Sequence, residues 1–79
     1  MGDDVSRLRW LCRRGMKELD VVFTRYLEER YPHAQPSERD AFRELLDMQD
    51  PVIWSLLLGR ERSDDPVIQN LIDQLATQR

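Results

Sequence analysis

Four prolines and three glycines divide this 79-residue chain into short segments. Within the segments, apolar residues recur every three to four positions, which is the spacing of one face of an α-helix. No segment alternates apolar and polar residues with a period of two, so the sequence predicts no β-sheet. A chain of this length buries roughly 60% of its unfolded surface, enough for one modest core. We therefore expect a single domain over residues 1–79 that is all-α, a compact bundle of five short helices.

Helix boundaries follow from the turn residues. The expected helices cover residues 4–14 after a cap at Asp3 or Asp4, residues 16–31, a third segment capped by Ser37, residues 51–58, and residues 66–77. Gly15 and Gly59 are expected to end helices because glycine adopts the left-handed conformation common just past a helix. Pro32 disfavours helical geometry at the residue before it. Asp50-Pro51 and Asp65-Pro66 each place an acceptor at the cap and proline at the first helical position.

The apolar residues of each segment predict which side is buried. The expected faces are Val5, Leu8, Leu11 and Cys12; Met16, Leu19, Val22, Phe23, Tyr26 and Leu27; Ala41, Phe42, Leu45 and Leu46; and Val67, Ile68, Leu71, Ile72 and Leu75. The fourth segment, PVIWSLLL, is apolar nearly all round. Such a helix is either central or exposes an apolar patch, and we expect it to be central, with Trp54 in the core.

Charge is unevenly distributed along the chain. The net charge is −3, yet residues 1–17 carry five basic residues against two acidic ones, and the remainder carries thirteen acidic against seven basic. The basic end suits an acidic partner or a phosphate. The acidic remainder disfavours general nucleic-acid binding, so we expect no nucleic-acid partner.

The residues that usually carry catalysis are scarce. Cys12 is the only cysteine and falls on an apolar face, and His33 is the only histidine and lies in a proline-flanked loop. One cysteine and one histidine make neither a disulfide nor a zinc set, and the scattered glycines make no phosphate loop. No apolar run approaches the ~18 residues of a membrane span, and no secretory signal is present. We expect a cytoplasmic monomer that is not an enzyme, binds no metal and holds no cofactor stably.

The first helix carries a surface that differs from its apolar face. At 100° per residue, Trp10 points away from the apolar side. Arg7 and Arg14 lie beside it at i−3 and i+4, flanked by Arg13. Arginine and tryptophan are enriched at binding hot spots, which favours a partner surface. The alternative is that Trp10 lies over a neighbouring helix as peripheral core.

Glu18 lies on the first turn of the second helix, away from its apolar stripe. One interpretation is structural: Glu18 favours the helix dipole and pairs with Arg14, which is worth roughly 0–1 kcal/mol for an exposed pair. The other is that a tight turn at Gly15 holds Arg14 and Glu18 together as a rigid recognition point of both charges. Spacing alone leaves these two interpretations equal.

Two segments resemble those of a known family. Arg14-Gly15-Met16-Lys17-Glu18 matches the R-G-x-x-E signature of the SdhE (YgfY) family of FAD assembly factors. The wider segments RLRWLCRRGMKELD and LLDMQDPVIWSLLLG are also similar to family segments, with Asp50, Trp54 and Gly59 matching in the second. The resemblance covers roughly residues 6–60, and the two segments in this order are specific where R-G-x-x-E alone is weak.

The resemblance implies a chaperone-like assembly factor. Family members promote covalent attachment of FAD to a histidine in the flavoprotein subunit of succinate dehydrogenase, and of fumarate reductase in some bacteria. By this resemblance Arg14, Gly15 and Glu18 engage the flavoprotein. We expect the neighbouring Arg7, Trp10, Arg13 and Lys17 to belong to the same partner-binding surface.

Two other functions compete with this one. The same family has been described as the antitoxin partner of a small membrane toxin, which predicts a phenotype indifferent to flavin. A small nucleic-acid-binding module using the arginine-rich first helix predicts strongly salt-dependent binding.

Overall fold

The computed structural model describes residues 2–77, which form five α-helices, one 3₁₀ turn and no strand. The elements are α1 (Gly2–Leu11), α2 (Lys17–Glu29), η1 (Tyr31–His33), α3 (Pro36–Leu46), α4 (Asp50–Leu57) and α5 (Pro66–Thr77). The prediction of an all-α bundle of five short helices is therefore confirmed. No helix in this range is long and apolar enough to cross a membrane.

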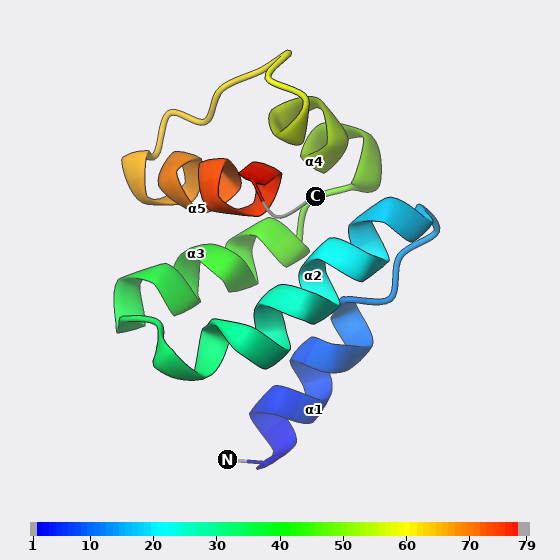
Figure 1. Ribbon diagram of the computed structural model, residues 1–79, viewed down its shortest axis with the longest axis vertical. Helices are drawn as coiled ribbons and strands as arrows, with labels where there is room; N and C mark the ends of the chain where they lie inside the picture. The colour runs from blue at the N-terminus through cyan, green and yellow to red at the C-terminus, as the bar shows by residue number, and fades with distance from the viewer. Residues whose placement is uncertain (1, 78–79) are drawn as a thin grey trace.

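The helices wrap around α2, which contacts α1 on one side and α5 on the other (Figure 1). The helix α5 in turn packs along α3 and against α4. After α1 the chain turns back through residues 12–16 to reach the start of α2. This loop comes close to the start of α4, where the side chain of Asp50 lies beside Gly15.

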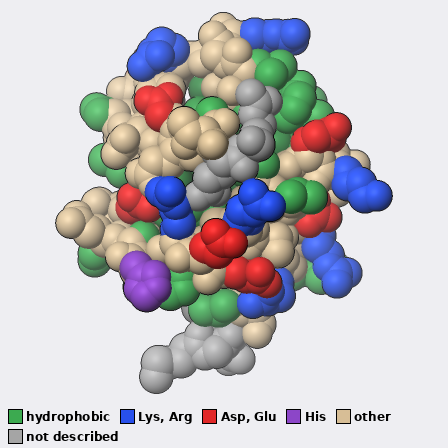
Figure 2. All heavy atoms as spheres, in the orientation of Figure 1, with side chains coloured by type: hydrophobic (Ala, Val, Ile, Leu, Met, Phe, Trp, Pro, Cys, Tyr) green, Lys and Arg blue, Asp and Glu red, His purple; other side chains and the backbone are tan. Residues whose placement is uncertain are grey.

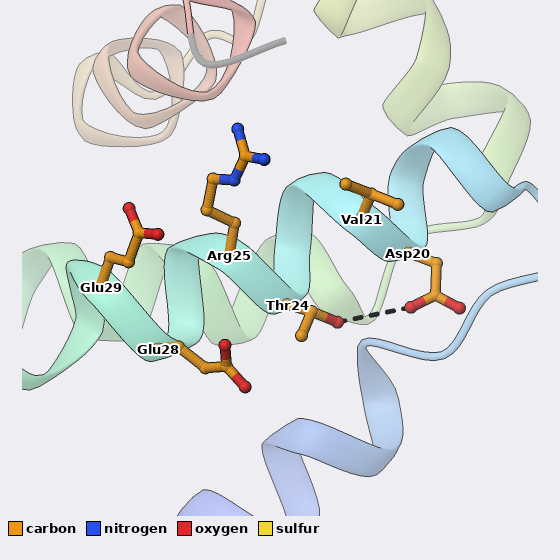
Figure 3. Close-up of a pocket in the computed structure, with 6 residues that line it drawn as sticks. All are labelled: Asp20, Val21, Thr24, Arg25, Glu28 and Glu29. Carbon is orange, nitrogen blue, oxygen red and sulfur yellow. Dashed lines mark hydrogen bonds between the residues drawn. The ribbon is translucent and has the colours of Figure 1, made fainter.

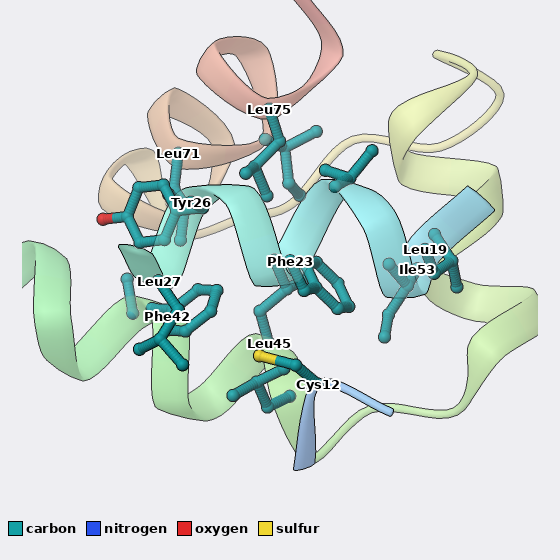
Figure 4. Close-up of a cluster of buried hydrophobic side chains, with 14 of the residues drawn as sticks. Cys12, Leu19, Phe23, Tyr26, Leu27, Phe42, Leu45, Ile53, Leu71 and Leu75 are labelled. Atoms are coloured by element: carbon teal, nitrogen blue, oxygen red, sulfur yellow. The ribbon is translucent and has the colours of Figure 1, made fainter. Parts of the chain in front are cut away.

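Aromatic side chains occupy the centre of the core (Figure 4). The Phe42 ring meets Phe23 edge-on at 5.9 Å between centroids, and it lies 4.6 Å from the Tyr26 ring and 5.7 Å from the Tyr31 ring. Such aromatic pairs add about 0.5–1.5 kcal/mol each beyond the area they bury. Since Phe42 belongs to α3, Phe23 and Tyr26 to α2, and Tyr31 to η1, this cluster joins three elements.

Proline sets the start of three helices. Helix α3 begins at Pro36, with Gln35 at the N-cap, so the prediction of a cap at Ser37 is wrong. Helix α4 begins at Asp50, with Gln49 at the N-cap, so Asp50 is already helical and does not cap. Proline accounts for the shift at α3, because its fixed φ suits the first turn, where the missing N–H has no helical partner. In α4, Pro51 is also in the first turn, at the second helical position and not the first.

The predicted helix cap at Asp65 and the predicted helix end at Gly59 are both confirmed. The Asp65 side chain accepts a hydrogen bond from the Val67 N–H at 2.9 Å, as an N-cap does. Gly59 has a φ of 79° and follows the last residues of α4, where the Arg60 N–H donates to the Ser55 carbonyl at 2.9 Å. A left-handed glycine is the expected end of such a helix.

Helix α1 begins and ends earlier than the sequence predicts, and its start at Gly2 makes the prediction of a cap at Asp3 or Asp4 wrong. Helix α2 is shorter than predicted. Helix α1 ends at Leu11 and not at Arg14, and α2 ends at Glu29 and not at Tyr31. The 3₁₀ turn η1 contains Pro32, whose restriction on the preceding residue explains the second difference. The first difference depends on tertiary contacts of Arg14, described below.

Most predicted core residues are buried, with exceptions at helix ends. Val5 and Val67, in the first turns of α1 and α5, are each 39% exposed. Helix α4 buries Ile53, Leu56 and Leu57 and leaves other apolar side chains in solvent, so it is not fully central. Figure 2 shows hydrophobic side chains on the part of this face where Figure 1 has α4, and charged side chains of both signs elsewhere on the face.

Candidate functional site

The loop between α1 and α2 closes the end of α1 with short-range hydrogen bonds. The Cys12 N–H donates to the Leu8 carbonyl at 2.9 Å, and the Arg13 N–H donates to the Trp10 carbonyl at 3.1 Å. Met16 is extended, and its carbonyl accepts from the Asp20 N–H to open α2. Residues 12–16 therefore connect the two helices, and together with the first turn of α2, which carries Glu18, they form the corner between α1 and α2.

Arg14 points into the protein from this corner. Its Nε donates to Asp50 Oδ1 at 2.8 Å, and its Nη2 donates to the Met48 carbonyl at 2.6 Å. Its Nη1 donates to the carbonyls of Leu11 and Leu46, each at 2.9 Å. The Arg14 side chain is only 11% exposed. The prediction of an outward stripe through Arg7, Trp10 and Arg14 is wrong at Arg14, because the helix ends before that residue and frees its side chain to turn inward.

The acceptors of Arg14 explain why it turns inward. Leu11 and Leu46 are the last residues of α1 and α3, where carbonyls have no partner within the helix. A cation at a helix C-terminus is also favoured by the helix dipole. The guanidinium further lies 5.9 Å from the centroid of the Phe23 ring. Arg14 therefore ties the ends of two helices and the start of a third to the core.

Gly15 is exposed and does not adopt the left-handed conformation that the sequence predicts for it. The helix has already ended at Leu11, so no left-handed residue is needed at position 15. A Cβ built on Gly15 would lie 3.9 Å from Asp50 Oδ2, which is ordinary van der Waals contact. Neither conformation nor space among residues 2–77 therefore requires glycine here.

Glu18 lies on the exposed side of the first turn of α2. Among the described residues it forms no ion pair or hydrogen bond, so the predicted pairing with Arg14 is absent, Arg14 being bound to Asp50 instead. Glu18 instead borders an open hollow of about 310 Å³ that is also lined by Val21, Val22 and Trp54. Its carboxylate is therefore available to a partner.

The remaining predicted contact residues lie in separate places. Trp10 is 68% exposed, which confirms its outward orientation, and the Arg13 guanidinium lies 5.6 Å from its ring centroid. Lys17 is exposed at the first residue of α2. Arg7 borders a groove between α1 and α3 together with Arg43 and three other residues. The seven predicted residues thus lie in or beside the corner without forming one cluster.

Two contributors to this region were not predicted. Asp50 is the partner of Arg14, yet 36 residues separate them and no sequence pattern connects the two. Val21 is 54% exposed and lies off the apolar stripe of α2. An apolar residue that lies off the buried stripe of a helix can indicate a binding surface. The position of Val21 in the sequence is such a signal.

The potential nucleophile is inert in this fold. Cys12 is completely buried, and burial raises the pKa of its thiol from 9.0 to about 11, with the charge of Arg14 acting weakly in the opposite direction. A protonated thiol is neither a nucleophile nor a metal ligand. His33 is exposed. No group of residues among 2–77 is arranged to hold a metal ion.

These features define a class of protein: a small all-helical bundle that presents an exposed, charged corner between two of its helices. The family described as flavinator of succinate dehydrogenase, Sdh5, matches residues 6–79. The chain belongs to this family.

Individual relatives agree with the family match. The chain is 48% identical to the FAD assembly factor SdhE of Methylococcus capsulatus over 70 residues, which cover 89% of this chain and 84% of the relative. It is 42% identical to the protein of the same name from Xylella fastidiosa, over 87% of this chain and 71% of the relative. The identity to the Coxiella burnetii protein of that name is 39%, over 91% of this chain and 92% of the relative.

Proposed function

We propose that this protein binds the flavoprotein subunit of succinate dehydrogenase and promotes the covalent attachment of FAD to it. The family and the names of the relatives support the reaction that is promoted. One structural observation carries the assignment of the contact site. Gly15 and Glu18 are exposed residues that the fold of the chain does not use, at the corner between α1 and α2.

Each residue of the corner then has a distinct task. Glu18 accepts a charged hydrogen bond from a basic side chain of the flavoprotein, since its carboxylate has no partner among residues 2–77. Gly15 leaves room for the backbone of the flavoprotein to approach closely. Arg14 does not touch the partner and positions this corner through its bonds to Asp50 and to backbone carbonyls. Trp10, Arg7, Arg13 and Lys17 extend the contact around it.

The protein promotes the reaction by orientation. Docking orders the immature flavoprotein around its FAD, so that the accepting histidine faces the flavin methyl group. Holding two reacting groups in place in this way removes much of the entropic barrier of a reaction. The groups that form the bond belong to the flavoprotein and the flavin, and this protein holds no FAD stably. The flavoprotein of fumarate reductase is a second client in this proposal.

Mixing purified apo-flavoprotein, FAD and this protein, and then measuring covalent flavin by fluorescence in a denaturing gel, tests the proposal. Glu18→Ala and Gly15→Arg are expected to slow flavin attachment at least about tenfold, as loss of an interface hot spot does. The matched control is Glu61→Ala, which removes an exposed carboxylate after α4, whereas Gly15→Ala, which adds only one methyl group to the contact, is expected to slow attachment less than Gly15→Arg. Melting temperatures within a few degrees of wild type show that folding is intact.

Undiminished attachment with both Glu18→Ala and Gly15→Arg would exclude this corner as the contact site. Equal attachment with and without the protein would exclude the function itself. The same assay with the flavoprotein of fumarate reductase decides whether it is a client.

A further inference from the structure

The hollow beside Glu18 is apolar, although it lies on a surface rich in charge. Val21 and Val22 of α2 form one wall and Trp54 of α4 forms the other, with Glu18 at the rim. Val22 is buried and Trp54 packs partly against the core, whereas Val21 is 54% exposed. Since the charged fraction of this chain is 34%, an apolar concave surface of this kind is unusual for it.

Acidic residues adjoin the hollow along α2. A second, shallow groove shares Val21 and is lined by Asp20, Thr24, Arg25, Glu28 and Glu29 (Figure 3). Two of these carboxylates have partners within the chain: Thr24 donates to Asp20 at 3.3 Å, and Arg9 pairs with Glu28 at 2.9 Å. Even so, with Glu18, four carboxylates and one guanidinium line these two depressions. The net charge of the residues that line the two depressions is therefore negative, which favours a partner segment that carries basic residues.

We propose that this hollow receives one apolar side chain of the flavoprotein subunit, from a segment that carries lysine or arginine beside that side chain. The proposal rests on the proposed function and adds to it the chemistry of the partner segment. Glu18 belongs to both the contact corner and the rim of the hollow, so the two form one continuous surface. The basic residue of the segment pairs with Glu18 while its apolar neighbour covers Val21 and Trp54.

The size of the hollow fits this occupant. At about 310 Å³ the hollow is larger than one leucine or phenylalanine side chain and so has room for it, and it lies at the lower limit of the ~300–1,000 Å³ of small-molecule pockets. It is open on its outer side, so a protruding side chain enters it directly. Tryptophan in a desolvated pocket is a frequent hot spot of protein interfaces, because water is excluded when the partner covers it.

Charging the hollow tests the inference. Val21→Lys places an ammonium group where the apolar side chain and its basic neighbour are expected, and we expect the Kd for the apo-flavoprotein to rise at least about tenfold. The uncharged variant Val21→Ser is expected to raise the Kd by about three- to tenfold, through lost apolar contact alone. Val67→Lys is the matched control, because Val67 is an exposed valine on α5 and the change in net charge is the same.

Fluorine NMR reports on Trp54 directly. The chain has two tryptophans, so labelling with 5-fluorotryptophan gives two signals, and Trp10→Phe assigns them in the free protein. Adding unlabelled apo-flavoprotein to the labelled wild-type chain is expected to change the chemical shift of the Trp54 signal.

The outcomes separate this inference from the proposed function. If Val21→Lys binds the flavoprotein normally and Glu18→Ala binds it weakly, the hollow does not receive a side chain of the partner, and the corner remains the contact site. The proposed role of the hollow would also be wrong if Val21→Lys and Val67→Lys weakened binding to the flavoprotein equally, or if the chemical shift of Trp54 were unchanged in the saturated complex. A wild-type chain that does not bind the flavoprotein would overturn both.

Discussion

Arg14→Lys is expected to destabilise this protein strongly although it keeps the positive charge. The arginine donates from three nitrogens to four acceptors, which are one Asp50 oxygen and the carbonyls of Leu11, Leu46 and Met48. A lysine has one nitrogen at the end of its chain and cannot reach acceptors that surround a planar fork. We expect at least two of the four hydrogen bonds to be lost.

The magnitude follows from the number of bonds lost. A hydrogen bond that involves a charged group contributes about 1.5–3 kcal/mol when buried, and the site is only partly buried, so water replaces some of each bond. We expect the free energy of unfolding to fall by about 2–4 kcal/mol. A chain of this length has a total stability of roughly 4–12 kcal/mol. The substitution therefore removes a large fraction of the stability.

Urea unfolding followed by circular dichroism measures this loss. With a slope of about 1 kcal/mol per molar urea, the low end for small proteins, the midpoint is expected to fall by roughly 2–4 M. Arg13→Lys is the matched control, because Arg13 is the adjacent arginine and is exposed, and its midpoint is expected to change by less than about 0.5 M. Asp50→Asn and the double variant Arg14→Lys/Asp50→Asn complete a double-mutant cycle that measures the coupling between the side chains at positions 14 and 50.

If Arg14→Lys and Arg13→Lys unfold at the same urea concentration, Arg14 does not hold the corner together. If Arg14→Lys keeps full stability and yet slows flavin attachment as much as Glu18→Ala does, Arg14 touches the partner itself, and the division of tasks proposed above is wrong.

Two further predictions concern neighbouring residues. Gly15→Ala is expected to raise the free energy of unfolding by about 0.4–1 kcal/mol, because alanine restricts the unfolded chain and fits the native backbone; a loss of more than 1 kcal/mol in urea unfolding would contradict this. The raised pKa of Cys12 favours the folded state fully below pH about 9, and this contribution is lost as the pH rises toward about 11. Urea unfolding across that range is expected to show a smaller loss for Cys12→Ala than for wild type, and a thiol reagent at pH 8 is expected to modify wild type only in urea.

Much of the fold can be predicted from local pattern. Apolar residues at helical spacing predict the buried faces of α2, α3 and α5, and Gly59 and Asp65 mark helix ends through their own backbone and side-chain chemistry. The end of α1 cannot be predicted in this way. Arg14 has good helix propensity, and it leaves the helix because acceptors between 32 and 36 residues further along the chain bind its guanidinium.

The candidate site is predictable to a similar degree. Spacing and family resemblance place Trp10, Gly15 and Glu18 on the surface, where the structure has them. The apolar hollow is not predictable, because Val21 and Trp54 meet only when α2 and α4 pack together. The direction of a side chain beyond a helix end likewise depends on which distant groups lack hydrogen-bond partners.

The bonds of Arg14 also fix when the corner can form during synthesis. Residues 14–18 are translated early, but the groups that hold Arg14 extend as far as Asp50, 36 residues later. At about 5–20 residues per second, the ribosome needs roughly two to seven seconds to add them. During that interval the nascent chain has the R-G-x-x-E segment without the corner. Competence to dock on the flavoprotein therefore begins only after α3 and the start of α4 have been made.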